Sequence, residues 1–193
     1  MAIEFELKYS ATAEQQAAIL AATDGPEQHF QMQTTYYDTP DGALSQRHIT
    51  LRRRMENQRS VCTLKTPSES GGRGEFELEC PDIETAIPEL CKLSGRSDLR
   101  TLLHGGVIPV CGARFTRTAK TIEQTDCTLE LAVDRGVLTG GGKEIPLCEV
   151  EVELKAGTRE SACMYAAALA AIHGLIPENR SKFRRALALY KGE

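Results

Sequence analysis

Charged and apolar residues alternate along several short stretches of this chain. A period of two is typical of a β-strand, because successive side chains of a strand point to opposite faces of the sheet. Residues 3–8 place Glu4, Glu6 and Lys8 on one face and apolar side chains on the other. Later stretches repeat this pattern with charges of both signs. A surface that combines carboxylates with lysines and arginines is suited to hold a metal ion together with a polyanion.

The same alternation recurs in five later segments. Their charged faces carry Arg52 and Arg54, Lys65, then Arg73, Glu75, Glu77 and Glu79, then Glu130 and Asp134, and finally Glu149, Glu151, Glu153 and Lys155. Arg53 has the opposite phase to its two neighbours, so we expect it on the outer surface. Around residues 114–117 the pattern is ambiguous, because Arg114 and Arg117 fall on opposite faces.

Most of the elements that must position these residues are strands. The alternation predicts strands at residues 3–8, 31–37, 49–55, 61–65, 73–80, 113–122, 127–134 and 145–155, with a short piece before the glycine turn at 140–142. The segment 38–42 contains Pro and Gly and predicts a turn. The glycine-rich segment 68–72 predicts a hairpin connection, and it lacks the ending of a phosphate-binding P-loop.

Four helical segments are expected between and after the strands. The first follows Thr12, which has the side chain of an N-cap, and ends at 24–26. Residues 83–103 are expected to be mainly helical, with Pro88 and Gly95 breaking the segment into short pieces. The last two are an alanine-rich helix at 159–173 and a final helix at 182–190.

Many strands in hairpin order with few helices between them predict an antiparallel sheet or a closed barrel. If the charged rows face outward, the protein is an ordinary barrel with an apolar core. If they face inward, helices must cover the apolar rows and the lumen becomes a charged tunnel. Composition alone favours the first arrangement. The near-perfect charge alternation of four separate strands favours the second.

Composition limits the class of protein. The length of 193 residues predicts a single domain over 1–193. The net charge of −4 and the absence of Trp argue against a nucleic-acid binder. Charged residues in the first strand exclude a signal peptide, and the apolar tract 165–172 is too short to cross a bilayer. The seven cysteines form no CxxC pair, which favours reduced core residues in a soluble, cytoplasmic protein.

The charged residues occur in an order that resembles a known family. The segments that carry the resemblance are Glu-Phe-Glu-Leu-Lys at 4–8, Tyr-Tyr-Asp-Thr-Pro-Asp at 36–41 with Leu44, Leu-Arg-Arg-Arg at 51–54, Thr-Leu-Lys at 63–65, Arg73 with Glu75, Glu130 with Asp134, Glu149 with Glu151 and Glu153, and Ser-Lys-Phe at 181–183. Together they resemble the CYTH superfamily of triphosphate tunnel metalloenzymes. Segments 36–41 and 147–153 are most similar to bacterial inorganic triphosphatases. The helical domain that often follows in those proteins is not expected after Glu193.

The resemblance implies an α+β fold built on an eight-stranded antiparallel β-barrel, a tunnel with a charged lumen, with helices packed outside and at the C-terminus. Such a tunnel admits a linear triphosphate, which needs a cationic lining. The candidate substrate-binding residues are Lys8, Arg52, Arg54, Lys65, Arg73, Arg117 and Lys182. Arginine suits bidentate contact with phosphoryl oxygens, while lysine acts as a point charge.

Carboxylates beside a polyanion imply a divalent cation between them. The candidate ligands of Mg²⁺ or Mn²⁺ are Glu4, Glu6, Glu149, Glu151, Glu153, Glu130, Asp134 and Glu75, with two ions expected during turnover. A metal at the glutamates of the closing strand would position the attacking water. The candidate catalytic residues are Glu149 and Glu151 on that strand, together with Lys65 and Arg54, which would stabilise the transferring phosphoryl group.

The expected activity is metal-dependent hydrolysis of inorganic triphosphate to diphosphate and phosphate. A class IV-type adenylyl cyclase or a thiamine triphosphatase would use the same tunnel, but we identify neither an adenine pocket nor apolar contacts for a thiazolium. A binder of polyphosphate or nucleotide without turnover is the alternative from another class. Arg73 and Glu75 could form a structural ion pair, and Glu77 and Glu79 could orient their basic neighbours. The metal, the oligomeric state and the role of the C-terminal helix as a plug or a lid stay open.

Overall fold

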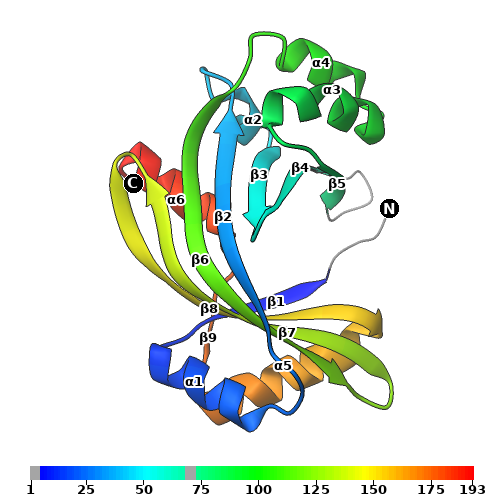
Figure 1. Ribbon diagram of the computed structural model, residues 1–193, viewed down its shortest axis with the longest axis vertical. Helices are drawn as coiled ribbons and strands as arrows, with labels where there is room; N and C mark the ends of the chain where they lie inside the picture. Colours follow the sequence, from blue (N-terminus) through cyan, green and yellow to red (C-terminus); the bar gives the residue numbers. More distant parts are fainter. Residues whose placement is uncertain (1–4, 68–72) are drawn as a thin grey trace.

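The computed structural model describes residues 5–67 and 73–193, with only the backbone of Arg73 included. The elements follow the chain in the order β1 (Glu6–Ser10), α1 (Ala13–Ala22), β2 (Gln28–Asp38), α2 (Ala43–Gln46), β3 (Thr50–Glu56), β4 (Arg59–Pro67), β5 (Arg73–Glu79), α3 (Ile83–Ser94), α4 (Ser97–Leu102), β6 (Ile108–Glu123), β7 (Cys127–Gly140), β8 (Lys143–Gly157), α5 (Arg159–His173), β9 (Ile176–Pro177) and α6 (Lys182–Lys191). Figure 1 shows how these elements surround one curled sheet.

All strands belong to a single antiparallel sheet with the order β5-β4-β3-β2-β6-β7-β8-β1-β9. The predicted antiparallel fold with helices outside and at the C-terminus is therefore confirmed. Among the described residues, hydrogen bonds join nine strands rather than eight and do not close the sheet into a ring. The sheet is instead strongly curled, with long strands β6, β7 and β8 bending around a concave face (Figure 1).

Two features help the long strands to bend. Register shifts occur between Tyr36 and Tyr37 in β2 and between Thr128 and Leu129 in β7, and such irregularities increase local twist. Gly136 lies where β7 crosses β6 closely, because a Cβ atom there would overlap the Arg114 carbonyl oxygen. This glycine allows β7 to run without a break, whereas the sequence pattern predicted a strand ending at 134 and a separate short piece.

The apolar rows of the strands face outward and are covered by helices. Helices α1 and α5 pack on β1, β7 and β8, where Ile19, Leu131, Val150 and Ala166 are fully or almost fully buried. A second apolar cluster lies under α3 and α4, on the outer side of β3, β4 and β5. Because the helices bury the apolar rows, the charged rows face the concave side. The structure thus has the inward-facing arrangement that the charge alternation and the family resemblance predicted.

Helix α6 packs on the concave face at one end of the sheet. Its Ala186 is fully buried against β6, β7 and β8, and Phe183 lies next to Tyr36 of β2 with ring centroids 5.0 Å apart. Gly140 permits this close packing, since a Cβ atom there would lie 2.8 Å from the Tyr190 nitrogen and still closer to the Ala186 carbonyl oxygen. The C-terminal helix therefore fills one end of the curled sheet.

Some element boundaries differ from the sequence-based prediction. Pro88 lies inside α3 and does not break it, because the buried stripe of Ile83, Ala86 and Leu90 holds the helix against the sheet despite one lost hydrogen bond. Gly95 ends α3 with φ 67°, as a left-handed cap. In the described part of the chain, strand β1 begins at Glu6, and residues 3 and 4 of the predicted strand lie outside the described residues.

The turn after β2 contains a short helix that the sequence did not predict. The carboxylate of Asp38 accepts hydrogen bonds from the backbone N–H groups of Thr39, Leu44 and Ser45. These bonds hold α2 in place and bury Leu44 in the cluster under α3. The first helix begins as expected, with Thr12 and Gln15 forming a capping box.

All seven cysteines are free thiols. Cys62, Cys80 and Cys127 are buried as the sequence indicated, whereas Cys148, also expected in the core, is half-buried. In the described part of the chain, none of the helices combines the length and apolar character needed to cross a bilayer. The assignment of residues 1–193 to one domain stays a prediction.

Replacing Gly140 with alanine should loosen α6, because the added methyl group overlaps its backbone. We expect the free energy of unfolding to fall by about 1–3 kcal/mol, the usual cost of overpacking. Urea unfolding followed by circular dichroism measures this change. Gly105→Ala serves as the control, since a Cβ atom at Gly105 has no neighbour within 4 Å. Equal stability of the two variants would contradict the close packing of α6.

Candidate functional site

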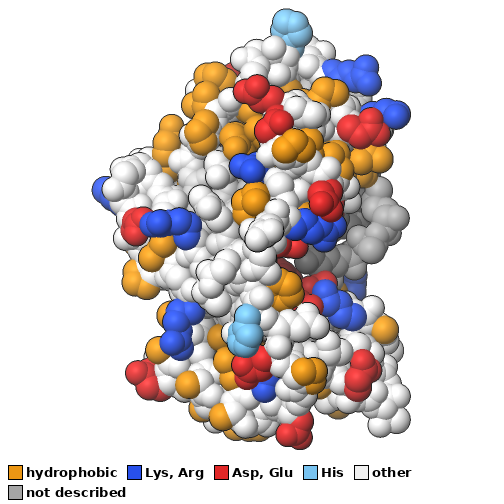
Figure 2. Space-filling view, in the orientation of Figure 1, with side chains coloured by type: hydrophobic (Ala, Val, Ile, Leu, Met, Phe, Trp, Pro, Cys, Tyr) orange, Lys and Arg blue, Asp and Glu red, His pale blue; other side chains and the backbone are white. Residues whose placement is uncertain are grey.

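A cavity of about 410 Å³ lies on the concave face of the sheet. Its charged lining residues, counted among those the structure describes, are six basic side chains (Lys8, Arg52, Arg54, Lys65, Arg117 and Lys182) and four acidic ones (Glu6, Glu75, Glu151 and Glu153). The formal charge of this lining is therefore +2. Charged side chains of both signs gather around a hollow at the right of the space-filling view (Figure 2).

The structure thus brings together most of the residues that the sequence singled out. The side chains of Glu4 and Arg73 lie outside the described residues, so their predicted positions are not placed. Glu130 lines a second, neighbouring cavity rather than the first. Asp134 and Glu149 line neither cavity, because both are fully buried behind the lining.

Strand register explains why several carboxylates lie side by side. Glu153 of β8 is directly opposite Glu6 of β1 and also opposite Glu130 of β7. Like charges in such positions repel each other. The Lys155 Nζ lies 2.8 Å from Glu153 and 3.6 Å from Glu130, and the Lys8 Nζ lies 3.3 Å from Glu6. These half-exposed carboxylates form an open row along the cavities.

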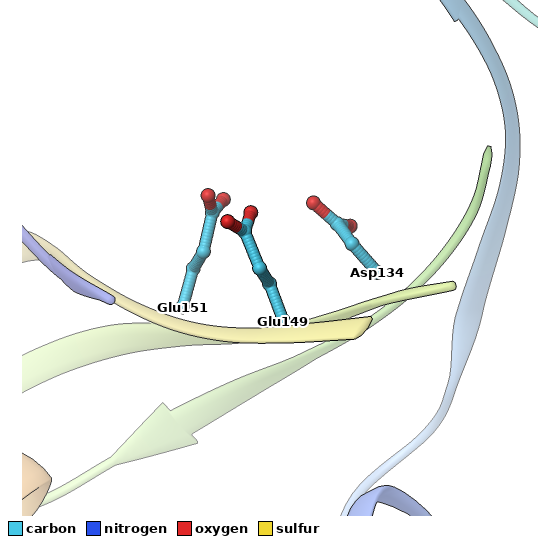
Figure 3. Close-up of side chains that lie close together, drawn as sticks. All are labelled: Asp134, Glu149 and Glu151. Carbon is cyan, nitrogen blue, oxygen red and sulfur yellow. The ribbon is translucent and has the colours of Figure 1, made fainter. Parts of the chain in front are cut away.

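A second group of carboxylates is buried. Asp134 from β7 and Glu149 and Glu151 from β8 point to the same side of the sheet (Figure 3). One oxygen from each lies within 4.8 Å of the others, which is close enough to bind a metal ion.

Basic side chains already compensate this buried group. The Lys182 Nζ lies 2.8 Å from Asp134 and 2.7 Å from Glu151, and it also contacts Glu149. Arg117 donates two hydrogen bonds of 2.8 Å to Asp134 and one of 2.5 Å to Glu151. Arg185 contacts Glu149. Three basic groups thus face three carboxylates, and two of these groups belong to α6.

The ion pairs decide which carboxylate ionises most readily. Burial opposes the ionisation of Glu151, but the charges of Lys182 and Arg117 outweigh it and lower the pKa of Glu151. Burial raises the pKa of Glu149, and the neighbouring charge of Glu151 raises it further. Burial also disfavours the charged form of Lys182, yet the three carboxylates raise its pKa above the ordinary lysine value. Glu151 is therefore the carboxylate that stays ionised beside the cavity.

Arg54 on β3 has an N–H group that could donate a hydrogen bond to a bound anion. Its Nε is buried and has no hydrogen-bond partner within the described residues, although its guanidinium lies 2.5 Å from Glu56. Burial lowers the pKa of Arg54, and the neighbouring Arg52 lowers it further. A buried N–H group without a partner costs free energy, which an anionic oxygen would recover. The cavity is therefore suited to an anion on this side.

Sequence reasoning missed two residues that hold the buried group. Arg185 lies three residues after Lys182 on α6, and this helical spacing was a signal that could have identified it. Gln16 of α1 is fully buried, and its side-chain amide donates to the carbonyl oxygens of Asp134 and Glu149. Its amide oxygen accepts from Arg135. A lone glutamine in a helix carries no sequence signal of such a role.

Replacing Lys182 with methionine should leave the buried carboxylates without enough compensating charge. We expect the variant to lose about 3 kcal/mol of stability or more at pH 7, the usual cost of breaking a buried ion pair. Lys155→Met, which removes a half-exposed partner of Glu153, should cost about 1 kcal/mol or less. Urea unfolding without added metal measures both values.

The stability lost in Lys182→Met should depend on pH, and the pKa of Glu151 gives the direction of this dependence. Because Glu151 has a lowered pKa, its ion pairs stabilise the folded protein above the ordinary glutamate value of 4.5. This stabilisation is lost as the pH falls through the lower pKa of the folded state. The stability difference between Lys182→Met and the unmodified protein should therefore shrink below about pH 4.5. A difference that stays constant with pH would contradict the assigned ion pairs.

Comparison with known proteins identifies the family of this chain. Residues 2–187 match the CYTH domain. An inorganic triphosphatase from Haemophilus influenzae is 34% identical over 132 residues, which cover 67% of this chain and 38% of that protein. The chain thus spans less than half the length of this curated relative.

Solved structures show the same fold at low sequence identity. One is HpAC1 from Hippeastrum, named as an adenylyl cyclase and described as having a dominant triphosphatase activity. It is 20% identical, with a TM-score of 0.65 over 98% of this chain and 95% of that chain. Another is the PH1819 protein from Pyrococcus horikoshii, which is 19% identical, with a TM-score of 0.60 over 98% and 99% of the two chains. The fold, the inward-facing charges and the match over residues 2–187 agree, and the chain belongs to the CYTH domain family.

Proposed function

We propose that this protein hydrolyses inorganic triphosphate to diphosphate and phosphate with the help of a divalent metal ion. The observation that carries the proposal is the first cavity, where, among the described residues, basic side chains outnumber carboxylates and both surround one space inside the sheet. Family membership and the similarity to the Haemophilus influenzae inorganic triphosphatase support it.

The basic residues would bind the phosphate chain from several sides. Arg52 and Arg54 come from β3 and Lys65 from β4, next to each other in the sheet. Lys8, Arg117 and Lys182 line the same cavity from β1, β6 and α6. Guanidinium groups can contact two phosphoryl oxygens at once, and the unpartnered Nε of Arg54 offers one such donor. Arg73 is retained as a further candidate from the sequence.

The carboxylates that line the first cavity fit a metal ion better than the two that lie behind it. Glu6, Glu151 and Glu153 line the cavity, whereas Asp134 and Glu149 are fully buried and line neither cavity. We infer that Glu6, Glu151 and Glu153 would hold Mg²⁺ or Mn²⁺, two hard cations that prefer oxygen ligands. When bound, such an ion reduces the repulsion between carboxylates and phosphate and makes a coordinated water more acidic.

The other residues would prepare the reaction by position and charge. Arg54 and Lys65 would stabilise the negative charge that develops on the transferring phosphoryl group. Glu151 stays ionised at the edge of the cavity and holds Lys182 and Arg117 in place through its ion pairs. Glu149 acts behind it, through Lys182 and Arg185, as a positioning residue. Among the remaining candidate ligands, Glu75 lies 2.8 Å from Lys65 and would orient that lysine.

We also infer a cytoplasmic protein whose partner is a small-molecule substrate. The seven free cysteines support a reducing compartment. Among the described residues, the lining of the first cavity has a net charge of +2, while the whole chain has a net charge of −4. Such a distribution favours a small anion over nucleic acid.

Release of phosphate from triphosphate should depend on Mg²⁺ or Mn²⁺ and on the cavity residues. We expect kcat to fall by about 10²–10³-fold in Arg54→Ala and in Lys65→Ala, because each removes a group that stabilises the transition state. Glu6→Gln should raise the metal concentration needed for half-maximal activity, because it removes one proposed metal ligand. Arg59→Ala, which removes an exposed arginine outside both cavities, is the control and should keep full activity.

The same assay separates the competing functions when it includes ATP and thiamine triphosphate. Formation of cyclic AMP from ATP would replace the proposal with a cyclase, and faster turnover of thiamine triphosphate would replace the substrate. Tight binding of triphosphate without turnover in either metal would indicate a binding protein and would refute hydrolysis.

A further inference from the structure

A second cavity of about 740 Å³ adjoins the first. The two share five lining residues, namely Arg52, Arg54, Glu75, Arg117 and Glu153. Because they share these side chains, the two spaces follow one another along the concave face. A ligand that is too long for the first cavity therefore extends into the second.

The charge of the lining changes sign between the two cavities. Among the described residues, the first cavity has six basic and four acidic side chains, a net charge of +2. The second has four basic and five acidic ones, a net charge of −1. The charged residues that belong only to the second cavity are Glu56, Glu77, Glu130 and Lys155. Three carboxylates against one lysine make the outer part of the path acidic.

These three carboxylates, which we call the acidic collar, are held in place by neighbours. Glu56 lies 2.5 Å from the Arg54 guanidinium, and Glu130 lies 3.6 Å from the Lys155 Nζ. Glu77 accepts a hydrogen bond of 2.7 Å from the Thr63 hydroxyl and lies 3.6 Å from Arg52. Burial opposes the ionisation of Glu77, but this hydrogen bond and the two arginines lower its pKa. Each carboxylate of the collar thus has a basic side chain as a neighbour.

The opposite end of the first cavity is lined by α6 and the residues just before it. Asn179, Ser181, Lys182 and Phe183 lie there, and Phe183 packs against Tyr36. A phosphate chain that reaches Lys182 therefore meets the start of a packed helix. Its other end points toward the collar.

We propose that Glu56, Glu77 and Glu130 limit the length of the phosphate chain that this protein accepts, so that triphosphate is favoured over longer linear polyphosphates. The inference rests on the proposed function. Every phosphate beyond the third adds negative charge, and in the second cavity this charge faces carboxylates across a partly buried space. A site that repels the wrong ligand discriminates as well as one that attracts the right one.

The test compares kcat/KM for linear tetraphosphate with kcat/KM for triphosphate, in the unmodified protein and in Glu56→Gln and Glu77→Gln. The ratio of the two values is informative because both variants also change the surroundings of Arg54 and Arg52, which contact either substrate. We expect the ratio of kcat/KM for tetraphosphate to kcat/KM for triphosphate to rise about fivefold in each single variant, because each removes one charge near the ligand in a hydrated site. The ratio should rise further in the double variant.

Glu79→Gln is the matched control. Glu79 lies two residues after Glu77 on the same face of β5, is exposed beside Arg59, and lines neither cavity. Its removal should leave the ratio unchanged. A general effect of net charge would raise the ratio in all three variants alike and would overturn the proposal.

The results distinguish failure of the collar proposal from failure of the proposed function. If triphosphate is hydrolysed and the double variant keeps the original ratio, the collar is wrong and the proposed function stands. If no substrate is hydrolysed, the proposed function fails, and calorimetric titration with triphosphate and tetraphosphate tests the collar through the ratio of dissociation constants. An unchanged Kd ratio in the variants would then refute it, and a ratio shifted about fivefold toward tetraphosphate would support it.

Discussion

The compensation of buried carboxylates by α6 and Arg117 is the interaction on which the rest of the structure depends. Asp134 and Glu149 are fully buried, and burying a carboxylate is costly unless a basic group accompanies it. Lys182, Arg185 and Arg117 provide that charge at the junction of α6 with β7 and β8. The same contacts place Lys182 at the cavity. Stability and the proposed binding of an anion therefore rely on one set of ion pairs.

The curled sheet carries charged side chains on its concave face, whereas an ordinary soluble barrel has an apolar interior and a charged outer surface. Its apolar rows face outward and need cover, which α1 and α5 provide on one side and α3 and α4 on the other. Its concave face carries charged rows around two joined cavities, and an apolar cluster lies at the end under α6. This division lets one sheet hold a hydrated, charged path while helices supply the buried apolar contacts that stabilise it.

Much of the fold and of the candidate site could be predicted because both depend on short-range patterns. Alternation showed that Arg52 and Arg54 share a face that Arg53 does not, and the capping residue Thr12 marked the first helix. The ordered resemblance to the CYTH family then supplied Arg117 and Lys182, which the structure places in the cavity. The pattern could not reveal Gln16, since its amide bonds residues more than a hundred positions away. It also could not show that Asp134 and Glu149 are fully buried while other candidate ligands line the cavity, because alternation reports the face of a residue and not its depth.

By itself, the sequence determined which side chains share a face, where several helices begin, and that carboxylates and basic groups accompany each other along the strands. Only the tertiary structure decided how deeply each carboxylate is buried, that Asp134 and Glu149 lie behind the cavity while Glu6 and Glu153 line it, and that the net charge of the lining differs in sign between the two cavities. The physical reason is that a period of two relates neighbours within a strand. Curvature, burial and ion pairing arise between strands and helices that are distant in the chain.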